Sequence, residues 1–162
     1  MRDAVIVSGA RTPIGSFGGV FKDVPASDLG AAAIRSALER ADLEPEQIDE
    51  VFMGNVLQAE EAGYAARLSA LRAGIPDEVP AITVNRACSS GLEAINIAAS
   101  FIRSGEIEVA VAGGTENMSR SPFLLGYQSR FDGLRMGNTE IRDSLIEGLS
   151  CPVNDYHMGV GA

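Results

Sequence analysis

The sequence predicts an α/β fold in which helices cover both faces of a parallel β-sheet. Short apolar runs rich in Val and Ile alternate along the chain with longer segments of helical period. This alternation favours parallel strands joined by right-handed crossovers. The strand runs are also apolar on both faces, which requires a helical layer on each side of the sheet.

Four apolar runs are the predicted strands of this sheet. They cover residues 4–10, 51–57, 80–85 and 107–114. The first, AVIVSGA, has the β-branched composition of a buried strand. The last ends in two glycines, which is typical of close backbone packing or of a positive φ angle. We therefore expect the order β-α-β-α-β-α-β over the first 114 residues.

Three helices are predicted between these strands, over residues 27–41, 65–73 and 90–104. Apolar residues of the first helix fall on one face. In the second, Leu68 and Leu71 are expected to point inward, with Gly74 ending the helix. The third contains LEAINIAASFI, which is apolar nearly all round and predicts a central, buried helix.

The regular pattern ends after the fourth strand. Residues 115–139 have no clear period, and one short amphipathic helix is predicted within residues 139–149. A long stretch with so little regular structure is usually functional or packed on something else.

Composition excludes several classes of function. A formal net charge of −9 makes sequence-independent nucleic-acid binding a poor fit. No apolar run approaches the roughly 20 residues that span a membrane, and the N-terminus lacks the features of a signal peptide. Two cysteines make no disulfide framework, which favours a cytoplasmic setting. Cys88, Cys151 and His157 share no zinc-type spacing, so no metal site is expected.

The segment VNRACSSGLEAI, residues 84–95, places Cys88 between a predicted strand and a predicted helix. Ser90 and Glu93 fit the S-x-x-E capping box that marks a helix start. The helix dipole at that end, equivalent to roughly half a positive charge, favours a thiolate. Cys88 is then either a nucleophile or a small buried hydrophobic residue. A nucleophile needs a base, and spacing alone does not bring the only histidine, His157, to it.

Several strings of residues carry a family resemblance. ARTPIGSFGG, DEVFMGNVLQA, VNRACSSGLEA, AGGTENMSRSP and NDYHMG, in this order, resemble the thiolase family of acetyl-CoA acetyltransferases and 3-ketoacyl-CoA thiolases. The resemblance covers essentially all 162 residues but only the N-terminal portion of a thiolase. It implies an incomplete N-terminal half of an αβαβα layered sandwich. Residues 1–118 would form the half-domain, residues 119–162 would begin an inserted loop domain, and the C-terminal half would be absent.

The resemblance also implies a chemistry, which is ping-pong acyl transfer through a cysteine thioester. Cys88 would be the acylated nucleophile, and its main-chain N–H would help to form an oxyanion hole. His157 and Met158, and also Leu149, would line the channel for the pantetheine arm of coenzyme A. Coenzyme A and acyl-CoA would be substrates, with no permanently bound cofactor. The family implies a homodimer or homotetramer.

The resemblance places the catalytic base, a histidine, and a second catalytic cysteine in the C-terminal half; Cys151 does not match that cysteine. We therefore expect little or no thiolysis from the 162 residues alone. Two departures from the family pattern stand out. Ser89 follows the nucleophile, which tilts the expected substrates toward longer chains. Glu60 and Glu61 stand in a loop that usually carries Gly, Gln and Asn.

Three alternatives remain open at this point. The chain is the N-terminal portion of a thiolase acyltransferase, a relative of the ketoacyl synthases, or a truncated non-catalytic chain that binds a partner.

Overall fold

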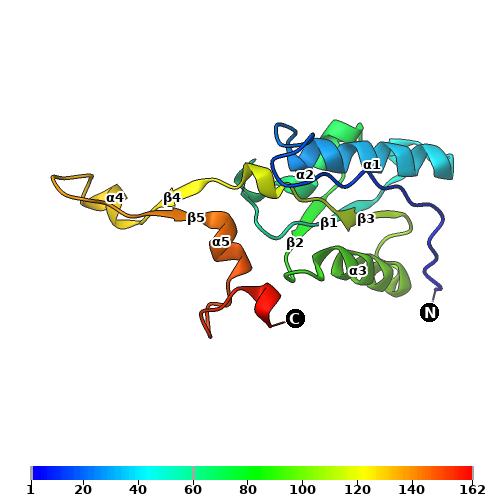
Figure 1. The fold of residues 1–162 in the computed structure, drawn as a ribbon. Coiled ribbons are helices and arrows are strands. Elements are labelled where there is room, and N and C mark those ends of the chain that lie inside the picture. The colour runs from blue at the N-terminus through cyan, green and yellow to red at the C-terminus, as the bar shows by residue number, and fades with distance from the viewer. Residues whose placement is uncertain (1, 60, 162) are drawn as a thin grey trace.

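The computed structural model describes residues 2–59 and 61–161, which form an α/β body and a projecting C-terminal segment (Figure 1). The body contains a three-stranded parallel sheet in the order β2-β1-β3. Helices α1 and α2 cover one face of this sheet, and α3 covers the other (Figure 1). The predicted α/β class, with helices on both faces, is confirmed. The elements of the body are α1 (Ala26–Ala41), β1 (Glu50–Gly54), α2 (Ala65–Ala73), β2 (Ala81–Val84), α3 (Ser90–Ser104) and β3 (Ala110–Gly114).

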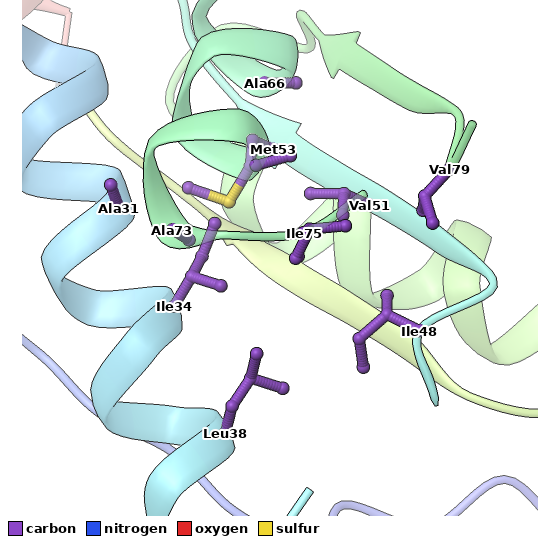
Figure 2. Close-up of a cluster of buried hydrophobic side chains, with 11 residues drawn as sticks. Ala31, Ile34, Leu38, Ile48, Val51, Met53, Ala66, Ala73, Ile75 and Val79 are labelled. Carbon is purple, nitrogen blue, oxygen red and sulfur yellow. The ribbon is translucent and has the colours of Figure 1, made fainter. Parts of the chain in front are cut away.

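Apolar side chains fill the space on each side of the sheet. On one side, α1 presents Ile34 and Leu38 toward the β1 side chains Val51 and Met53 (Figure 2). On the other side, the fully buried Phe52 meets Phe101 of α3 edge to face, with ring centroids 5.5 Å apart. The central strand β1 therefore feeds both cores, and all five of its residues are buried.

The predicted helices agree closely with the observed ones. The ranges for α2 and α3 coincide with the predictions, and α1 begins one residue earlier than predicted. The strands are shorter than predicted, because the apolar runs extend beyond the residues that pair, after β1, before β3 and at both ends of β2. Residues 56 and 57 leave the sheet, since the main-chain N–H groups of Val56 and Leu57 donate to the Glu116 carboxylate instead of to a strand.

The inward face of α2 differs from the prediction. Leu71 is 39% exposed and Leu68 is only half-buried. The two helices approach so closely that a Cβ atom on Gly30 of α1 would lie 2.4 Å from the Ser69 hydroxyl. Only small side chains fit in this contact, so size decides which face of α2 is buried. The buried residues of α2 are Ala65, Ala66, Ser69, Ala70 and Ala73.

The predicted strand over residues 4–10 is wrong. This run is extended but pairs with no strand in the described structure, and Val5, Ile6 and Val7 are each more than 70% exposed. Residues 7–10 and β3 line the same cavity, which has a volume of about 200 Å³. A β-ladder needs neighbouring strands about 4.8 Å apart, so the run lacks a partner at bonding distance. A hydrogen bond from Arg40 to the Gly9 carbonyl, 2.7 Å, holds it to α1.

The segment after β3 also differs in part from the prediction. Residues 141–143 are a strand rather than part of the predicted 139–149 helix, since β5 (Ile141–Asp143) pairs antiparallel with β4 (Phe123–Leu125). Asp143 then caps the short helix α5 (Ser144–Leu149) by accepting a hydrogen bond from the Leu145 N–H. Helix α4 (Gln128–Phe131) lies near the tip of the projecting C-terminal segment, the projecting arm (Figure 1). Four 3₁₀ turns, Pro45–Gln47, Glu61–Gly63, Met118–Arg120 and Met158–Val160, complete the elements of the described chain.

Two neighbouring carboxylates at the start of β1, Asp49 and Glu50, have pKa values shifted in opposite directions. Asp49 accepts hydrogen bonds from the N–H groups of Val109 and Glu108, which lower its pKa. Burial raises the pKa of Glu50, and the negative charge of Glu106 adds to this shift.

We predict opposite effects from neutralising these two side chains. A lowered pKa stabilises the fold above the ordinary value of 3.8 for Asp49, and this stability is lost as the pH falls through the folded-state value. Asp49→Asn should therefore lower the free energy of unfolding at neutral pH, by about 1 kcal/mol or less because Asp49 is exposed. A raised pKa destabilises the fold above the ordinary value of 4.5 for Glu50. The substitution Glu50→Gln should therefore raise the free energy of unfolding at neutral pH.

Urea unfolding of the two variants, followed by circular dichroism from neutral to acidic pH, measures these effects. The difference for Glu50→Gln should shrink as the pH falls from the raised folded-state pKa toward 4.5 and be absent below it, whereas the difference for Asp49→Asn should shrink only as the pH falls below 3.8. Two variants that destabilise the chain equally at neutral pH would contradict the assignment.

Candidate active site

Cys88 lies in the turn that joins β2 to α3, two residues before the helix begins at Ser90. Its thiol is on the surface. The preceding residue, Ala87, has a φ of 47°, in the left-handed region that non-glycine residues rarely adopt. Such backbone strain persists only where the surroundings enforce it, and it concentrates at functional sites.

Two side chains hold this turn from both sides. The Asn85 Oδ1 accepts a hydrogen bond from the Ala87 N–H at 3.1 Å, and the Asn85 Nδ2 donates to the Val56 carbonyl at 3.0 Å. The buried Ser90 hydroxyl accepts from the Arg86 N–H at 2.8 Å and donates to the Ala87 carbonyl at 2.6 Å. Both main-chain groups of Ala87 are therefore bound, which explains how its left-handed conformation is kept.

The predicted capping box at Ser90 and Glu93 is not formed. Ser89 is the residue that caps α3, and its side chain makes no capping bond. The Ser90 hydroxyl is used in the turn, and the Glu93 carboxylate accepts a hydrogen bond from the Arg86 guanidinium at 2.5 Å. This bond from Arg86, with a weaker one from Asn96, lowers the pKa of Glu93. The S-x-x-E pattern thus marks the helix start correctly while its side chains serve the turn before it.

Two glycines at the strand ends, Gly54 and Gly114, let the first turn of α3 rest directly on the sheet. A Cβ atom on Gly54 would lie 2.6 Å from the Gly91 nitrogen, and one on Gly114 would lie 3.1 Å from the Gly54 carbonyl oxygen. The predicted close packing at the last strand therefore applies to Gly114. At Gly113 a Cβ would meet only the Met53 sulfur, at 3.6 Å. Cys88 is consequently held at the carboxyl end of the parallel sheet.

The loop after β1 is fixed by the carboxylate of Glu116, which follows β3. Its Oε2 accepts hydrogen bonds from the N–H groups of Val56, 2.8 Å, and Leu57, 3.2 Å. Its Oε1 accepts from the Asn55 Nδ2 at 2.9 Å. Sequence reasoning missed both Glu116 and Asn85 as site residues. A usable signal was their position, because each polar side chain stands one or two residues after the carboxyl end of a parallel strand.

The unusual acidic loop before α2 is compensated by a cation. The Ser27 hydroxyl donates to the Glu61 carboxylate at 2.5 Å, and Arg72 forms ion pairs with Glu61, 2.7 Å, and with Asp28, 3.2 Å. Arg72 also donates to the Ser27 hydroxyl. The Glu61 side chain thereby joins its loop to α1 and α2. Glu60 lies outside the described residues.

The other predicted site residues lie in the segment after β5. Helix α5 ends at the half-buried Leu149, and a Cβ on the adjacent Gly148 would lie 2.5 Å from a methyl group of Leu57. This end of α5 therefore packs against the loop that Glu116 holds. His157 is exposed, and its Nδ1 accepts the Gly159 N–H at 3.1 Å, so it caps the turn that contains Met158. The hydrogen bond of its imidazole is therefore local to this turn.

Within residues 2–59 and 61–161, no group of three His, Cys, Asp or Glu side chains is arranged to hold a metal ion. None of the helices in the same residues is long and apolar enough to cross a membrane.

The fold and site together define a class of α/β proteins in which a surface cysteine sits where a parallel strand turns into a central helix. Residues 4–162 match the family described as "Thiolase, N-terminal domain". This match covers nearly the whole chain, so the chain belongs to the thiolase family.

Named relatives agree with this assignment. The chain is 50% identical to a "Probable acetyl-CoA acyltransferase" of Staphylococcus epidermidis and 49% identical to an "Acetyl-CoA acetyltransferase" of Cupriavidus necator. All of this chain is covered in both comparisons, but only 41% of each relative. The crystal structure of the Bacillus anthracis acetyl-CoA acetyltransferase superposes with a TM-score of 0.91 at 43% identity, over 98% of this chain and 40% of that one. The chain thus corresponds to about two fifths of these proteins.

The two cysteines should differ in reactivity. Cys88 is exposed at a helix start, whereas Cys151 is partly covered and its N–H and carbonyl bond to Tyr156 and Asp155. We expect limiting iodoacetamide to alkylate Cys88 faster, by about 10-fold, because exposure and a helix N-terminus both favour thiolate reactivity. Peptide mapping by mass spectrometry measures the two rates in one sample. Faster labelling of Cys151 would contradict the assignment of Cys88 as the reactive thiol.

The glycine contact beneath the site gives a second prediction. Gly54→Ala should displace the first turn of α3 and lower the free energy of unfolding by about 1–3 kcal/mol, the usual cost of overpacking. It should also slow the alkylation of Cys88. Gly113→Ala is the matched control at the same edge of the sheet, because its Cβ has room. Equal stability of the two variants, measured by urea unfolding, would rule out the close contact.

Proposed function

We propose that the protein carrying this chain is a thiolase-type acyltransferase that forms a thioester on Cys88. The observation that carries the proposal is the exposed Cys88 thiol at the strand–turn–helix junction of a thiolase-family chain. The relatives named acetyl-CoA acyltransferase and acetyl-CoA acetyltransferase support acyl-CoA thioesters as the substrate class.

The proposed reaction has two halves. In the degradative direction the Cys88 thiolate attacks the keto carbon of a 3-ketoacyl-CoA, and the bond between the keto carbon and its neighbour on the CoA side breaks. That neighbour takes up a proton and leaves as acetyl-CoA, while the acyl group remains on the sulfur. The thiol of a second coenzyme A then attacks the thioester, and its proton returns to the enzyme as the Cys88 thiolate is released. The reverse sequence condenses two acetyl-CoA molecules.

The chain's own residues contribute position and charge stabilisation. Cys88 lies two residues before the first residue of α3, so the positive end of the helix dipole is close to the nucleophile turn. The Cys88 main-chain N–H is proposed as one donor of an oxyanion hole. It lies in a turn whose preceding peptide is held by Asn85 and Ser90, so its direction is fixed before substrate arrives.

The coenzyme A channel is proposed to include Leu149, His157 and Met158. The packing of α5 against Leu57 supports this placement, because it brings the segment after β5 to the loop bonded to the nucleophile turn. We propose the division into a half-domain, residues 1–118, and the start of a loop domain, residues 119–162. The change from the α/β body to the projecting arm supports it (Figure 1).

We propose that catalytic groups outside residues 1–162 complete the site. The family resemblance places the base histidine and a second catalytic cysteine outside the residues that match this chain, whose single histidine is His157. Residues 1–162 alone should then turn over several orders of magnitude more slowly than the protein as its gene encodes it. We also propose a homo-oligomer acting in the cytoplasm. Exposed apolar side chains such as Phe123, Phe131 and Leu92 support association.

Acyl capture tests the proposed function directly. The protein as its gene encodes it is mixed with acetyl-CoA, quenched in acid and analysed by intact and peptide mass spectrometry. We expect one acetyl group per chain on Cys88, its loss in Cys88→Ala, and its retention in Cys151→Ala. Absence of the adduct, or an adduct on Cys151 alone, would overturn the proposal and favour a non-catalytic, partner-binding chain.

A further inference from the structure

We propose that Asn85 is a positioning residue for Cys88, which fixes the nucleophile turn against the loop that Glu116 holds; this inference rests on the proposed function. Neither Asn85 nor Glu116 was among the site residues predicted from the sequence. The juxtaposition that carries the inference is a continuous series of hydrogen bonds from the end of β3, through the loop after β1, to the residue before Cys88.

The series passes through both ends of one residue, Val56. The Val56 N–H donates to the Glu116 Oε2 at 2.8 Å, and the Val56 carbonyl accepts from the Asn85 Nδ2 at 3.0 Å. The Asn85 Oδ1 in turn accepts from the Ala87 N–H at 3.1 Å. Movement of the loop after β1 is thus transmitted to Ala87 and to the peptide that enters Cys88.

This turn needs an external constraint. Ala87 has no glycine-like freedom, yet its φ of 47° is in the left-handed region. Ser90 binds the Ala87 carbonyl from the helix side, and Asn85 binds the Ala87 N–H from the strand side. Relaxation of φ at this residue would swing the Cys88 N–H and sulfur together. Displacements on the order of 1 Å at a reacting group cost about 100-fold in rate.

The side chain at position 85 must donate and accept at the same time. Its donor faces a carbonyl oxygen of Val56 and its acceptor faces an N–H of Ala87, and a neutral amide supplies both groups on one short side chain. An aspartate of the same shape keeps the acceptor but places a carboxylate oxygen against the Val56 carbonyl. A leucine of similar size makes neither bond. These two substitutions therefore separate loss of the loop contact from loss of the whole constraint.

Single-turnover acylation tests the inference in the protein as its gene encodes it. Wild type, Asn85→Asp, Asn85→Leu and Glu116→Gln are mixed with acetyl-CoA, and the adduct on Cys88 is followed against time. The matched control is Asn96→Leu, which alters an exposed asparagine on α3 whose amide reaches only Glu93, at 3.4 Å. Rates are expressed per site that becomes acylated at long times, so that unfolded molecules do not contribute.

We expect the acylation rate per site to fall about 10- to 100-fold in both Asn85 variants, and less in Glu116→Gln. Steady-state kinetics should show this loss in kcat, with KM within about two-fold of the wild type, since the substituted residues are not among the proposed residues of the pantetheine channel. The double variant Asn85→Leu with Glu116→Gln should lose less acylation rate than the product of the two single fold-losses, because both substitutions act through Val56. The control should match the wild type.

The outcomes separate this inference from the proposed function. A wild-type protein that takes up no acetyl group overturns the function itself. An acylated wild type, with Asn85 variants that react at the same rate per site, overturns the positioning role. The positioning role is also overturned if the Asn85 variants have fewer sites that become acylated but an unchanged rate per site, since that result means a role in folding alone. If the Asn85 variants do not fold, an unchanged rate per site in Glu116→Gln decides against the inference.

Discussion

The close contact between the first turn of α3 and the ends of β1 and β3 is the constraint on which the site depends. A helix normally stands about 10 Å from the sheet that it covers, which leaves room for two layers of side chains. At Gly54, Gly91 and Gly114 those layers are absent, and main chain meets main chain. The helix start is thereby lowered onto the strand ends, and the cysteine before it is placed at the sheet's carboxyl edge. A displacement of this contact would move every group that follows.

Much of the fold could be predicted from local patterns, because helices carry their own signals. The limits of α2 and α3 follow from their periodicity and from Gly74 and Gly105, whose positive φ angles end them. Strands depend on partners that lie elsewhere in the chain. The run at residues 4–10 has the composition of a strand, but the described chain places no strand beside it at bonding distance. Likewise, the burial of α2 was decided by its distance from α1, which periodicity does not contain.

The candidate site was predictable where its chemistry is local. The position of Cys88 between a strand and a helix could be read from twelve consecutive residues. The supports of that cysteine could not, because the hydrogen bonds of Asn85 and Glu116 join positions that lie 29 and 60 residues apart. The roles of Leu149, His157 and Met158 stay predictions. For these residues the structure supplies surroundings, namely the packing of α5 on Leu57 and the local turn at His157.

The compensated charge at Glu61 constrains the evolutionary order in which this loop could have changed. The Glu61 side chain is only 18% exposed, and its carboxylate meets the buried Ser27 hydroxyl, so without a cation it would be costly to desolvate. Arg72 is different, because it also pairs with Asp28 and is itself partly exposed. An ancestor could therefore acquire the arginine first at little cost and the glutamate afterwards, whereas the opposite order passes through an unpaired acid. An acid at position 61 thus depends on a cation at position 72, whereas an arginine at position 72 does not depend on Glu61.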